Sequence, residues 1–143
     1  GEVATEFSFT FETGPAVVSG RADRLETLPD GSVRVVDIKT GGLATLKLLP
    51  QNPQLLAYQL AVLQQGFRSG GAALLELKRT KKNQLGDQDP LDDQEAEQTA
   101  EEFANVAQEL AGSTYPAVVG SWCRVCEFKS ICPAQDESAR GTE

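Results

Sequence analysis

Two aspartates and a lysine lie in one short stretch of the chain, at a spacing that suits a divalent cation. Asp23 follows a small apolar run, and fourteen residues later Asp37-Ile38-Lys39 ends a second run. The intervening Pro29-Asp30-Gly31 predicts a hairpin turn, which would bring the two aspartates together. Because successive side chains of a strand point to opposite faces, Asp37 and Lys39 share a face and Ile38 points the other way. Two carboxylates beside an ammonium group predict a cation site.

These residue types have a defined chemistry around a metal ion. Magnesium prefers oxygen ligands from one or two carboxylates, together with waters and phosphate oxygens. Asp23 and Asp37 could supply the carboxylates, and the backbone carbonyl of Ile38 could add a neutral oxygen. Lys39 would then orient or help to deprotonate an attacking water and offset charge developing on a phosphate.

A helix is predicted to follow these strands and to line the same cleft. Asn52 offers an N-cap and Pro53 the first helical position, so the helix is expected over 52–65. Gln54 and Tyr58 are four residues apart and therefore share one face of that helix. Both side chains could face the two aspartates.

Three cysteines near the end of the chain form a metal-type pattern. Cys123 and Cys126 are a C-x2-C pair, and Cys132 follows with Pro133 directly behind it. Thiolates at this spacing can converge on one metal or cluster, but a site held wholly by cysteine needs a fourth ligand. The chain has no other cysteine and no histidine. Three explanations stay open: a fourth cysteine outside the chain, a non-cysteine ligand, or three ordinary buried thiols.

Composition and charge limit the class of protein. The 143 residues are 40% hydrophobic, enough for one globular unit. With no bilayer-length apolar run and no secretion signal, we expect a soluble, cytoplasmic protein without a membrane partner. The net charge is -8, but residues 87–102 carry eight acids and no base, and the rest of the chain is neutral. The basic cluster of Lys78, Arg79, Lys81 and Lys82 could touch phosphates or be an ordinary solvated loop.

Periodicity predicts the remaining elements. Phe7, Phe9 and Phe11 alternate with polar residues, as in a half-buried strand, and Gly20 could be a bulge or a point of close approach. Stretches 3–11, 16–28, 33–38 and 72–77 are predicted strands, 91–111 is a second helix, and 40–51 and 80–90 are loops. The expected buried stripes are Leu56, Leu60 and Leu63 on the first helix, and Phe103, Val106, Ala107 and Leu110 on the second.

Four elements in order resemble the PD-(D/E)xK nucleases, and within them the RecB-like nuclease domains of bacterial helicase-nuclease complexes. The matches are Gly20-Arg21-Ala22-Asp23-Arg24 to the G-R-x-D-R element, Asp37-Ile38-Lys39-Thr40-Gly41 to D-x-K-[ST], and Gln54 with Tyr58 to Q-x-x-x-Y. The run from Trp122 to Pro133 is similar to the cysteine run that supplies three of the four ligands of an iron–sulfur cluster in one branch of the family. Together the matches span about residues 20–133.

The resemblance implies an α/β fold, with a restriction-endonuclease-like mixed central sheet of about four strands flanked by helices and an irregular, cysteine-containing C-terminal tail. It implies a nuclease core over 1–112 that lacks its N-terminal helix, followed by a tail over 113–135. The terminal residues 136–143 are predicted to be disordered from their position and composition alone. A histidine and a first cysteine that lie upstream in the family are missing. We therefore hypothesise a C-terminal fragment of a larger parent, whose uncovered sheet face could form a non-native dimer.

The resemblance also assigns roles. Asp23, Asp37 and the Ile38 carbonyl would hold Mg2+ or Mn2+, Lys39 would be the catalytic lysine, and Gln54 and Tyr58 would support the site or contact DNA. Glu6 could correspond to a further family acid, although a solvent-facing glutamate is the preferred interpretation. In the parent, Cys123, Cys126 and Cys132 would hold a [4Fe-4S] cluster with a fourth cysteine from outside this chain.

The implied function is a metal-dependent DNA exonuclease or endonuclease that hydrolyses phosphodiester bonds. It would act on single strands delivered by a helicase domain or subunit of the same complex in recombinational repair. The parent would be the active deoxyribonuclease, and this chain alone would be weak or inactive. A catalytically inactive nuclease-fold module that binds DNA or a partner protein is the alternative, and a zinc-stapled interaction domain is a third interpretation, resting on the cysteines alone.

Overall fold

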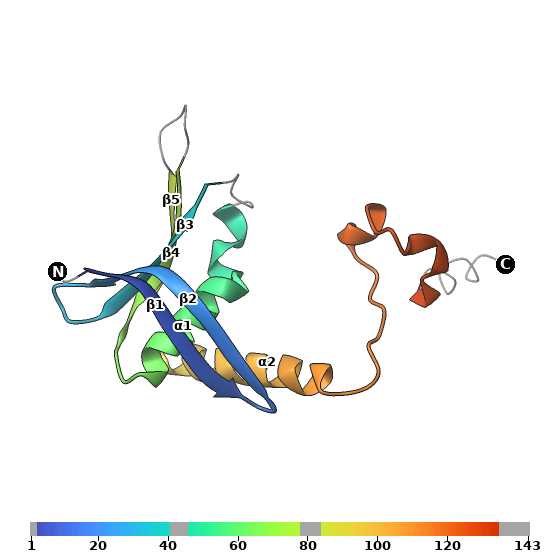
Figure 1. Ribbon diagram of the computed structural model, residues 1–143, viewed down its shortest axis with the longest axis horizontal. Helices are drawn as coiled ribbons and strands as arrows, with labels where there is room; N and C mark the ends of the chain where they lie inside the picture. Colours follow the sequence, from blue (N-terminus) through green and yellow to red (C-terminus); the bar gives the residue numbers. More distant parts are fainter. Residues whose placement is uncertain (1–2, 41–45, 78–83, 135–143) are drawn as a thin grey trace. The chain divides into compact units, whose positions relative to one another are not determined.

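A five-stranded mixed sheet forms the centre of the computed structural model, which describes residues 3–40, 46–77 and 84–134. The strand order is β1-β2-β3-β4-β5; β3 and β4 are parallel and the other neighbours antiparallel. This confirms the predicted α/β fold class (Figure 1). The elements are β1 (Val3–Thr13), β2 (Ala16–Thr27), β3 (Val33–Lys39), η1 (Leu46–Gln51), α1 (Pro53–Gln64), β4 (Ser69–Glu76), β5 (Gln84–Gln88), α2 (Asp93–Leu110), η2 (Ser121–Arg124) and η3 (Lys129–Ile131), where η marks a 3-10 helix.

The β1–β2 ribbon buries the aromatic face that the alternation predicts. Phe9 and Phe11 are buried, and Phe7 packs against the same core. Gly20 pairs with Phe9 across the ribbon, and a Cβ added at Gly20 would lie 2.6 Å from the Phe9 ring. The predicted close approach at Gly20 is confirmed, because only a residue without a side chain leaves room for this ring.

The hairpin between β2 and β3 forms at the predicted turn. Asp30 Oδ1 accepts hydrogen bonds from the backbone N–H and the hydroxyl of Ser32, at 3.0 and 2.7 Å. Gly31 supplies the left-handed conformation, with φ 81°. The turn sets the register that pairs Arg24 with Val36, so Asp23 comes next along β2 beside Asp37.

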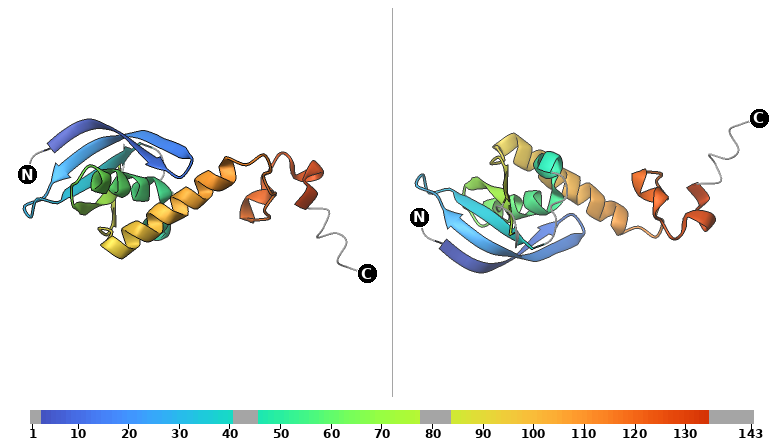
Figure 2. Two further views of the ribbon diagram at one scale, coloured as in Figure 1. Left: turned by 90° about the horizontal axis from the view of Figure 1, so that it is seen from below. Right: turned by 90° about the horizontal axis from the view of Figure 1, so that it is seen from above.

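Helix α1 connects the parallel strands β3 and β4 and packs on one face of the sheet. Asn52 is the predicted N-cap; its Oδ1 accepts from the N–H groups of Gln54 and Leu55 at 3.0 and 3.2 Å. The predicted buried stripe is wrong in part. Leu60 is buried, but Leu56 and Leu63 are only half-buried, and the most deeply buried side chains of α1 include Leu55, Gln59 and Val62. Both views of Figure 2 show why: α1 lies between the β1–β2 ribbon and α2, so most of its circumference is covered.

Strand β5 corrects the predicted loop over 80–90 and makes the sheet five-stranded rather than about four-stranded. Gln84–Gln88 pairs antiparallel with β4. Its sequence, QLGDQ, has little strand propensity, and tertiary contacts compensate. Gln88 is buried and its Nε2 donates to the Leu49 carbonyl at 2.8 Å, while Asp87 forms an ion pair with Arg34. Residues 80–83 of the predicted loop, and the basic cluster at 78–82, lie outside the described residues.

Helix α2 begins two residues later than predicted and turns a different face inward. Asp92 caps it: the Glu95 N–H donates to Asp92 Oδ1 at 2.8 Å, and Glu95 Oε2 accepts from the Asp92 N–H at 3.0 Å. Two residues of the predicted stripe are exposed, Val106 at 55% and Leu110 at 62%. The inward positions are mostly small: Ala96, Thr99, Ala100, Phe103 and Ala107. In the part of the chain that the structure describes, no helix is long and apolar enough to cross a membrane.

The chain divides into two compact units, residues 1–108 and 109–143. The second unit contains the cysteines and two short 3-10 turns, η2 and η3, so the predicted tail is irregular apart from these turns. The segment 136–143, predicted to be disordered, lies outside the described residues.

Candidate active site

Asp37 is the centre of the candidate site. It is 3% exposed, near the end of β3, on the face that α1 covers. Its Oδ1 accepts a hydrogen bond from the Tyr58 hydroxyl at 3.1 Å and one from Gln54 Nε2 at 3.3 Å. Gln54 Nε2 also donates to Tyr58 Oη at 2.9 Å, which is the contact expected of residues four apart on a helix. The structure thus brings three of the predicted site residues into one hydrogen-bonded group.

Tyr58 acts in this group as a neutral donor. Burial, followed by the charge and hydrogen bond of Asp37, raises the pKa of Tyr58 to about 12, against a smaller lowering by Gln54. The Phe9 ring meets the Tyr58 ring edge to face, with centroids 5.6 Å apart. The Arg21 carbonyl, at 3.4 Å, is a weaker second acceptor for the hydroxyl. At neutral pH Tyr58 therefore orients Asp37 and exchanges no proton.

Lys39 lies on the other side of the Asp37 carboxylate. Its Nζ is 2.8 Å from Asp37 Oδ2, and the lysine side chain is 43% exposed. Asp37 Oδ2 is itself buried and accepts no well-aligned hydrogen bond among the described residues. The 2.8 Å distance makes Lys39 and Asp37 an ion pair, although the angles at the two groups do not meet those of a hydrogen bond. Asp37 Oδ2 is therefore the oxygen that remains available to a cation.

Asp23 is held beside Asp37 by the backbone of β3. Its Oδ2 accepts a hydrogen bond from the Ile38 N–H at 2.7 Å. That N–H belongs to the peptide that joins Ile38 to Asp37, so the Asp23 carboxylate lies within one residue of Asp37. The Ile38 side chain is 36% exposed and lines a separate groove with Val36, as the alternation predicts.

The donor set fits a divalent cation of the magnesium type. Within the described residues no group of three or more histidine, cysteine, aspartate or glutamate side chains is arranged to hold a metal. Magnesium needs only one or two carboxylates when waters and phosphate oxygens complete its shell. Asp23 and Asp37 meet that requirement, and the buried Asp37 Oδ2 without an aligned donor is an observation in its favour. The role of the Ile38 carbonyl stays a prediction.

The three cysteines are placed in the second unit. Cys123 and Cys132 are half-buried and Cys126 is exposed, and all three are free thiols. The Gly120 N–H donates to Cys123 Sγ at 3.3 Å. Over the described ranges the thiols do not form a three-ligand group. The geometry therefore does not support the iron–sulfur cluster, which continues to rest on the spacing alone.

Sequence reasoning missed Glu76. This carboxylate is 2% exposed at the end of β4, and the parallel register pairs it with Lys39. One signal could have found it: the sequence contains the pattern of two apolar residues, an acid, an apolar residue and a lysine twice, as Val-Val-Asp-Ile-Lys over 35–39 and as Leu-Leu-Glu-Leu-Lys over 74–78.

Glu6 has an unusual backbone. It has φ 54°, and among the described residues it alone combines a positive φ with a side chain. The pairs Thr5–Arg24 and Phe7–Ala22 place it opposite Asp23. Its side chain is exposed, in line with the preferred interpretation, and a role in the site is not tested.

Comparisons with known proteins identify the family of this chain. A model of the PD-(D/E)XK nuclease superfamily matches residues 1–133. Fourteen chains of solved structures also match, and one of them, titled "Crystal structure of SSO0001", is 25% identical with a TM-score of 0.54. The match covers 93% of this chain and 61% of that one, so this chain spans less than two thirds of its length. No curated protein matched. The family match over nearly the whole chain and the acid–lysine site at the end of β3 lead to one conclusion: the chain belongs to the PD-(D/E)XK nuclease superfamily.

Proposed function

We propose that the chain is a metal-dependent nuclease module that hydrolyses phosphodiester bonds in DNA. The observation that carries the proposal is the asymmetry of the Asp37 carboxylate. Tyr58 and Gln54 hold its Oδ1, whereas its buried Oδ2 faces only the Lys39 ammonium among the described residues. A carboxylate oriented on one side and available on the other is suited to binding a cation in a defined position.

The residues of the chain have distinct tasks in this proposal. Mg2+ or Mn2+ would supply charge neutralisation at the phosphate and an acidified water. Asp23 and Asp37 would hold the ion, with the Ile38 carbonyl as a third oxygen. Lys39 would orient the water and offset the charge that develops on the phosphate oxygens. The water oxygen bonds to phosphorus, the bond to the leaving oxygen breaks, and the proton lost by the water ends on the leaving group or in solvent.

We further propose a RecB-like role, in which a helicase domain or subunit delivers single-stranded DNA to this site during recombinational repair in the cytoplasm. Support comes from the order of the motifs around Asp23, Asp37 and Gln54, and from the neighbouring positions of these residues. A [4Fe-4S] cluster bound by the three cysteines and by a fourth cysteine from outside this chain would stabilise the fold of the parent. No step of the reaction requires it.

The alternative is a nuclease-fold module that binds DNA or a partner protein without cutting. We expect the 143-residue chain to have little or no activity in isolation, because the family resemblance includes a histidine in the metal shell and this sequence contains none. The combination of Asp23, Asp37 and Lys39 favours the enzyme, because binding alone gives no reason for an ammonium beside two carboxylates.

The test is a nuclease assay on single-stranded DNA with Mg2+ or Mn2+, using the longer natural polypeptide. Asp37→Asn keeps the shape of the side chain and removes its charge, and should abolish cleavage. Asp93→Asn is the matched control, since Asp93 is exposed at the start of α2. Equal cleavage by the Asp37→Asn variant and the wild type would refute the site. DNA binding without cleavage in the wild type would favour the alternative.

A further inference from the structure

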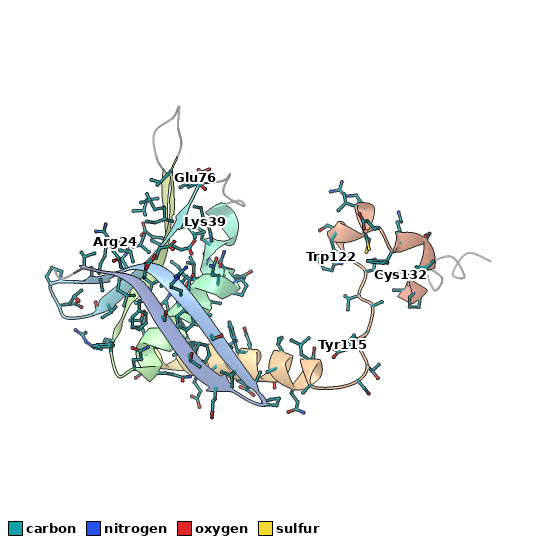
Figure 3. The ribbon with its side chains drawn as sticks, in the orientation of Figure 1. Arg24, Lys39, Glu76, Tyr115, Trp122 and Cys132 are labelled. Carbon is teal, nitrogen blue, oxygen red and sulfur yellow. The ribbon has the colours of Figure 1, made fainter. Side chains whose placement is uncertain are left out.

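Phe9 is a buried aromatic residue of β1 that contacts the candidate site through Tyr58. Its side chain is 7% exposed, and its ring meets the Tyr58 ring edge to face, with centroids 5.6 Å apart. The Tyr58 hydroxyl is the closer of the two donors to Asp37 Oδ1, at 3.1 Å. The ribbon that carries Phe9 lies across α1, and Lys39 is labelled at the site end of β3 (Figure 3). One side chain, that of Tyr58, therefore separates Phe9 from the carboxylate that would hold the cation.

Gly20 of β2 lies opposite Phe9 on the neighbouring strand. The register pairs the two residues, and a Cβ built on Gly20 would lie 2.6 Å from Phe9 Cζ and 3.1 Å from Cε1. Ordinary contacts of a Cβ atom begin at 3.4 Å, so a methyl group at position 20 would displace the ring by about 0.8 Å. The glycine therefore sets how closely the Phe9 ring approaches β2.

The Phe9 ring is enclosed by other rings of the core. It stacks with Phe11 at a centroid distance of 6.2 Å and an interplanar angle of 19°, and both belong to the same core cluster as Tyr58. Side chains in a close-packed interior transmit a displacement to their neighbours rather than absorb it. A shift of the Phe9 ring is therefore passed to Tyr58, the ring that it contacts edge to face.

The Tyr58 hydroxyl is sensitive to a small displacement because two acceptors lie near it. Asp37 Oδ1 is at 3.1 Å and the Arg21 carbonyl oxygen is at 3.4 Å. A hydroxyl has one proton, so it donates to one of these oxygens at a time. The two distances differ by 0.3 Å, which is less than the displacement that a methyl group at position 20 would cause. A shift of the Tyr58 ring would exchange the carboxylate for the carbonyl as the acceptor.

We propose that Phe9, with Gly20 opposite it, is a positioning residue that keeps the Tyr58 hydroxyl on Asp37. This inference rests on the proposed function, because it concerns the carboxylate that would bind the metal. Phe9 touches neither the metal nor the substrate. It fixes the Tyr58 ring, so that the hydroxyl holds Oδ1 and the other oxygen of Asp37, Oδ2, stays in one position for a divalent cation.

Metal affinity measures this role without any turnover. Loss of a residue that orients a metal ligand lowers metal affinity by about ten- to a hundredfold. Gly20→Ala should therefore weaken Mn2+ binding by about tenfold, because its methyl group displaces Phe9. Tyr58→Phe should weaken binding to a similar extent. Gly20→Ala should then have little further effect, because the hydroxyl through which it acts is already absent.

The experiment is a double-mutant cycle by isothermal titration with MnCl2. The four proteins are the full 143-residue chain, Gly20→Ala, Tyr58→Phe and the double variant. Equal weakening by Gly20→Ala in the two backgrounds, or wild-type affinity in Gly20→Ala, would overturn the inference. If Gly20→Ala does not fold, Phe9→Leu takes its place in the cycle. Leucine removes the ring contact with Tyr58, so it should weaken binding only while the Tyr58 hydroxyl is present.

Gly70→Ala is the matched control for a general loss of packing. A Cβ at Gly70 would also lie too close to its neighbours, at 2.9 Å from atoms of Leu28 and Ser32. Gly70 follows the rung that pairs Ser69 with the first residue of β3, at the end of that strand away from Asp37. This variant should keep the Mn2+ affinity of the wild type, and a tenfold loss would show that any crowded glycine of the sheet has the same effect and would overturn the inference.

Asp37→Asn separates this inference from the proposed function. If the wild type binds no Mn2+, or if Asp37→Asn binds it equally well, the proposed metal site is wrong. If Asp37→Asn abolishes binding while the cycle shows no coupling, the metal site stands and the role of Phe9 is wrong.

Discussion

Replacement of Tyr58 by phenylalanine isolates the contribution of one hydroxyl to the site. Phenylalanine keeps the buried ring and its edge-to-face contact with Phe9. The lost hydroxyl donates to Asp37 Oδ1 at 3.1 Å and accepts from Gln54 Nε2 at 2.9 Å. The variant therefore removes the closer of the two donors that hold Asp37 and leaves the packing in place.

The structure sets the size of the effect. A hydrogen bond to a charged acceptor is worth about 1.5–3 kcal/mol. Gln54 Nε2 still reaches Asp37 Oδ1 at 3.3 Å in the variant, so the carboxylate keeps one donor. We expect the free energy of unfolding at pH 7 to fall by the lower end of that range, about 1.5–2 kcal/mol.

The difference between wild type and variant should depend on pH. The pKa of Tyr58 is raised from 10.0 to about 12 by the fold. Above pH 10 the unfolded tyrosine loses its proton while the folded one keeps it, so the folded state binds more protons and the wild type loses stability as pH rises. The stabilising contribution of Tyr58 is thus complete below pH 10 and is lost progressively up to about pH 12. The phenylalanine side chain of the variant cannot ionise, so the gap between the two proteins should narrow over this interval.

Urea unfolding followed by circular dichroism at pH 7, 9, 10 and 11 tests this expectation. Fluorescence is unsuitable, because the single tryptophan, Trp122, lies in the second unit and is 60% exposed. Tyr115→Phe is the control, since its exposed hydroxyl donates only to the Leu110 carbonyl among the contacts of the described chain. Equal stability of wild type and Tyr58→Phe at pH 7, or a gap that stays constant to pH 11, would refute the reasoning.

Three further perturbations test other parts of the molecule. Gln59→Leu should lower the free energy of unfolding, measured by urea titration, by about 3 kcal/mol or more. The substitution leaves the partners of the buried Gln59 amide, including Ser69, Gln88 and the Leu91 N–H, without their hydrogen bonds. A decrease below about 1 kcal/mol would contradict a stabilising role for these hydrogen bonds. Glu6→Gly should keep the Mn2+ affinity, and loss of Mn2+ binding in this variant would indicate that the Glu6 carboxylate is a metal ligand. Glu6→Val should lower the free energy of unfolding by about 1–2 kcal/mol, because the left-handed backbone conformation at this position is unfavourable for valine. If the cluster forms, Cys132→Ser should remove the visible absorption of the iron–sulfur cluster from the anaerobically purified parent. A wild-type parent without this absorption would refute the cluster proposal.

The parts of the site that could be predicted from the sequence depend on local geometry. The Asp30-Gly31 turn fixes the β2–β3 register, so Asp23 and Asp37 meet without information from elsewhere in the chain. The spacing of Gln54 and Tyr58 places them on one helical face whatever the helix packs against. Short-range rules are sufficient for these four residues.

The features that could not be predicted depend on contacts between distant segments. The position of Glu76 beside Lys39 follows from a parallel register that has a shift between Val33 and Val35, and no turn chemistry specifies it. Strand β5 forms although its residues are polar, because β4 supplies a hydrogen-bonding edge and η1 receives the Gln88 side chain.

The buried faces of the helices differ from the prediction for another reason. The stripe rule assumes that a helix has one buried side and one solvent side. Helix α1 lies between two layers, so Gln59 is buried among polar partners and the buried residues of α1 do not form a single apolar stripe. Helix α2 approaches closely through alanines, and its larger apolar residues, Val106 and Leu110, point outward.

The same contacts divide the site into a rigid part and an adjustable part. Asp37 Oδ1 is held by two side chains of α1, and Asp23 by a backbone N–H of β3, so neither carboxylate can turn without breaking hydrogen bonds to regular secondary structure. Of the described site residues, Lys39 is the one that combines a charge, substantial exposure and a contact that a cation must displace. Cation binding should therefore rearrange one side chain and leave the strands in place. The cost of preparing the site then lies almost wholly in moving one ammonium group away from Asp37 Oδ2.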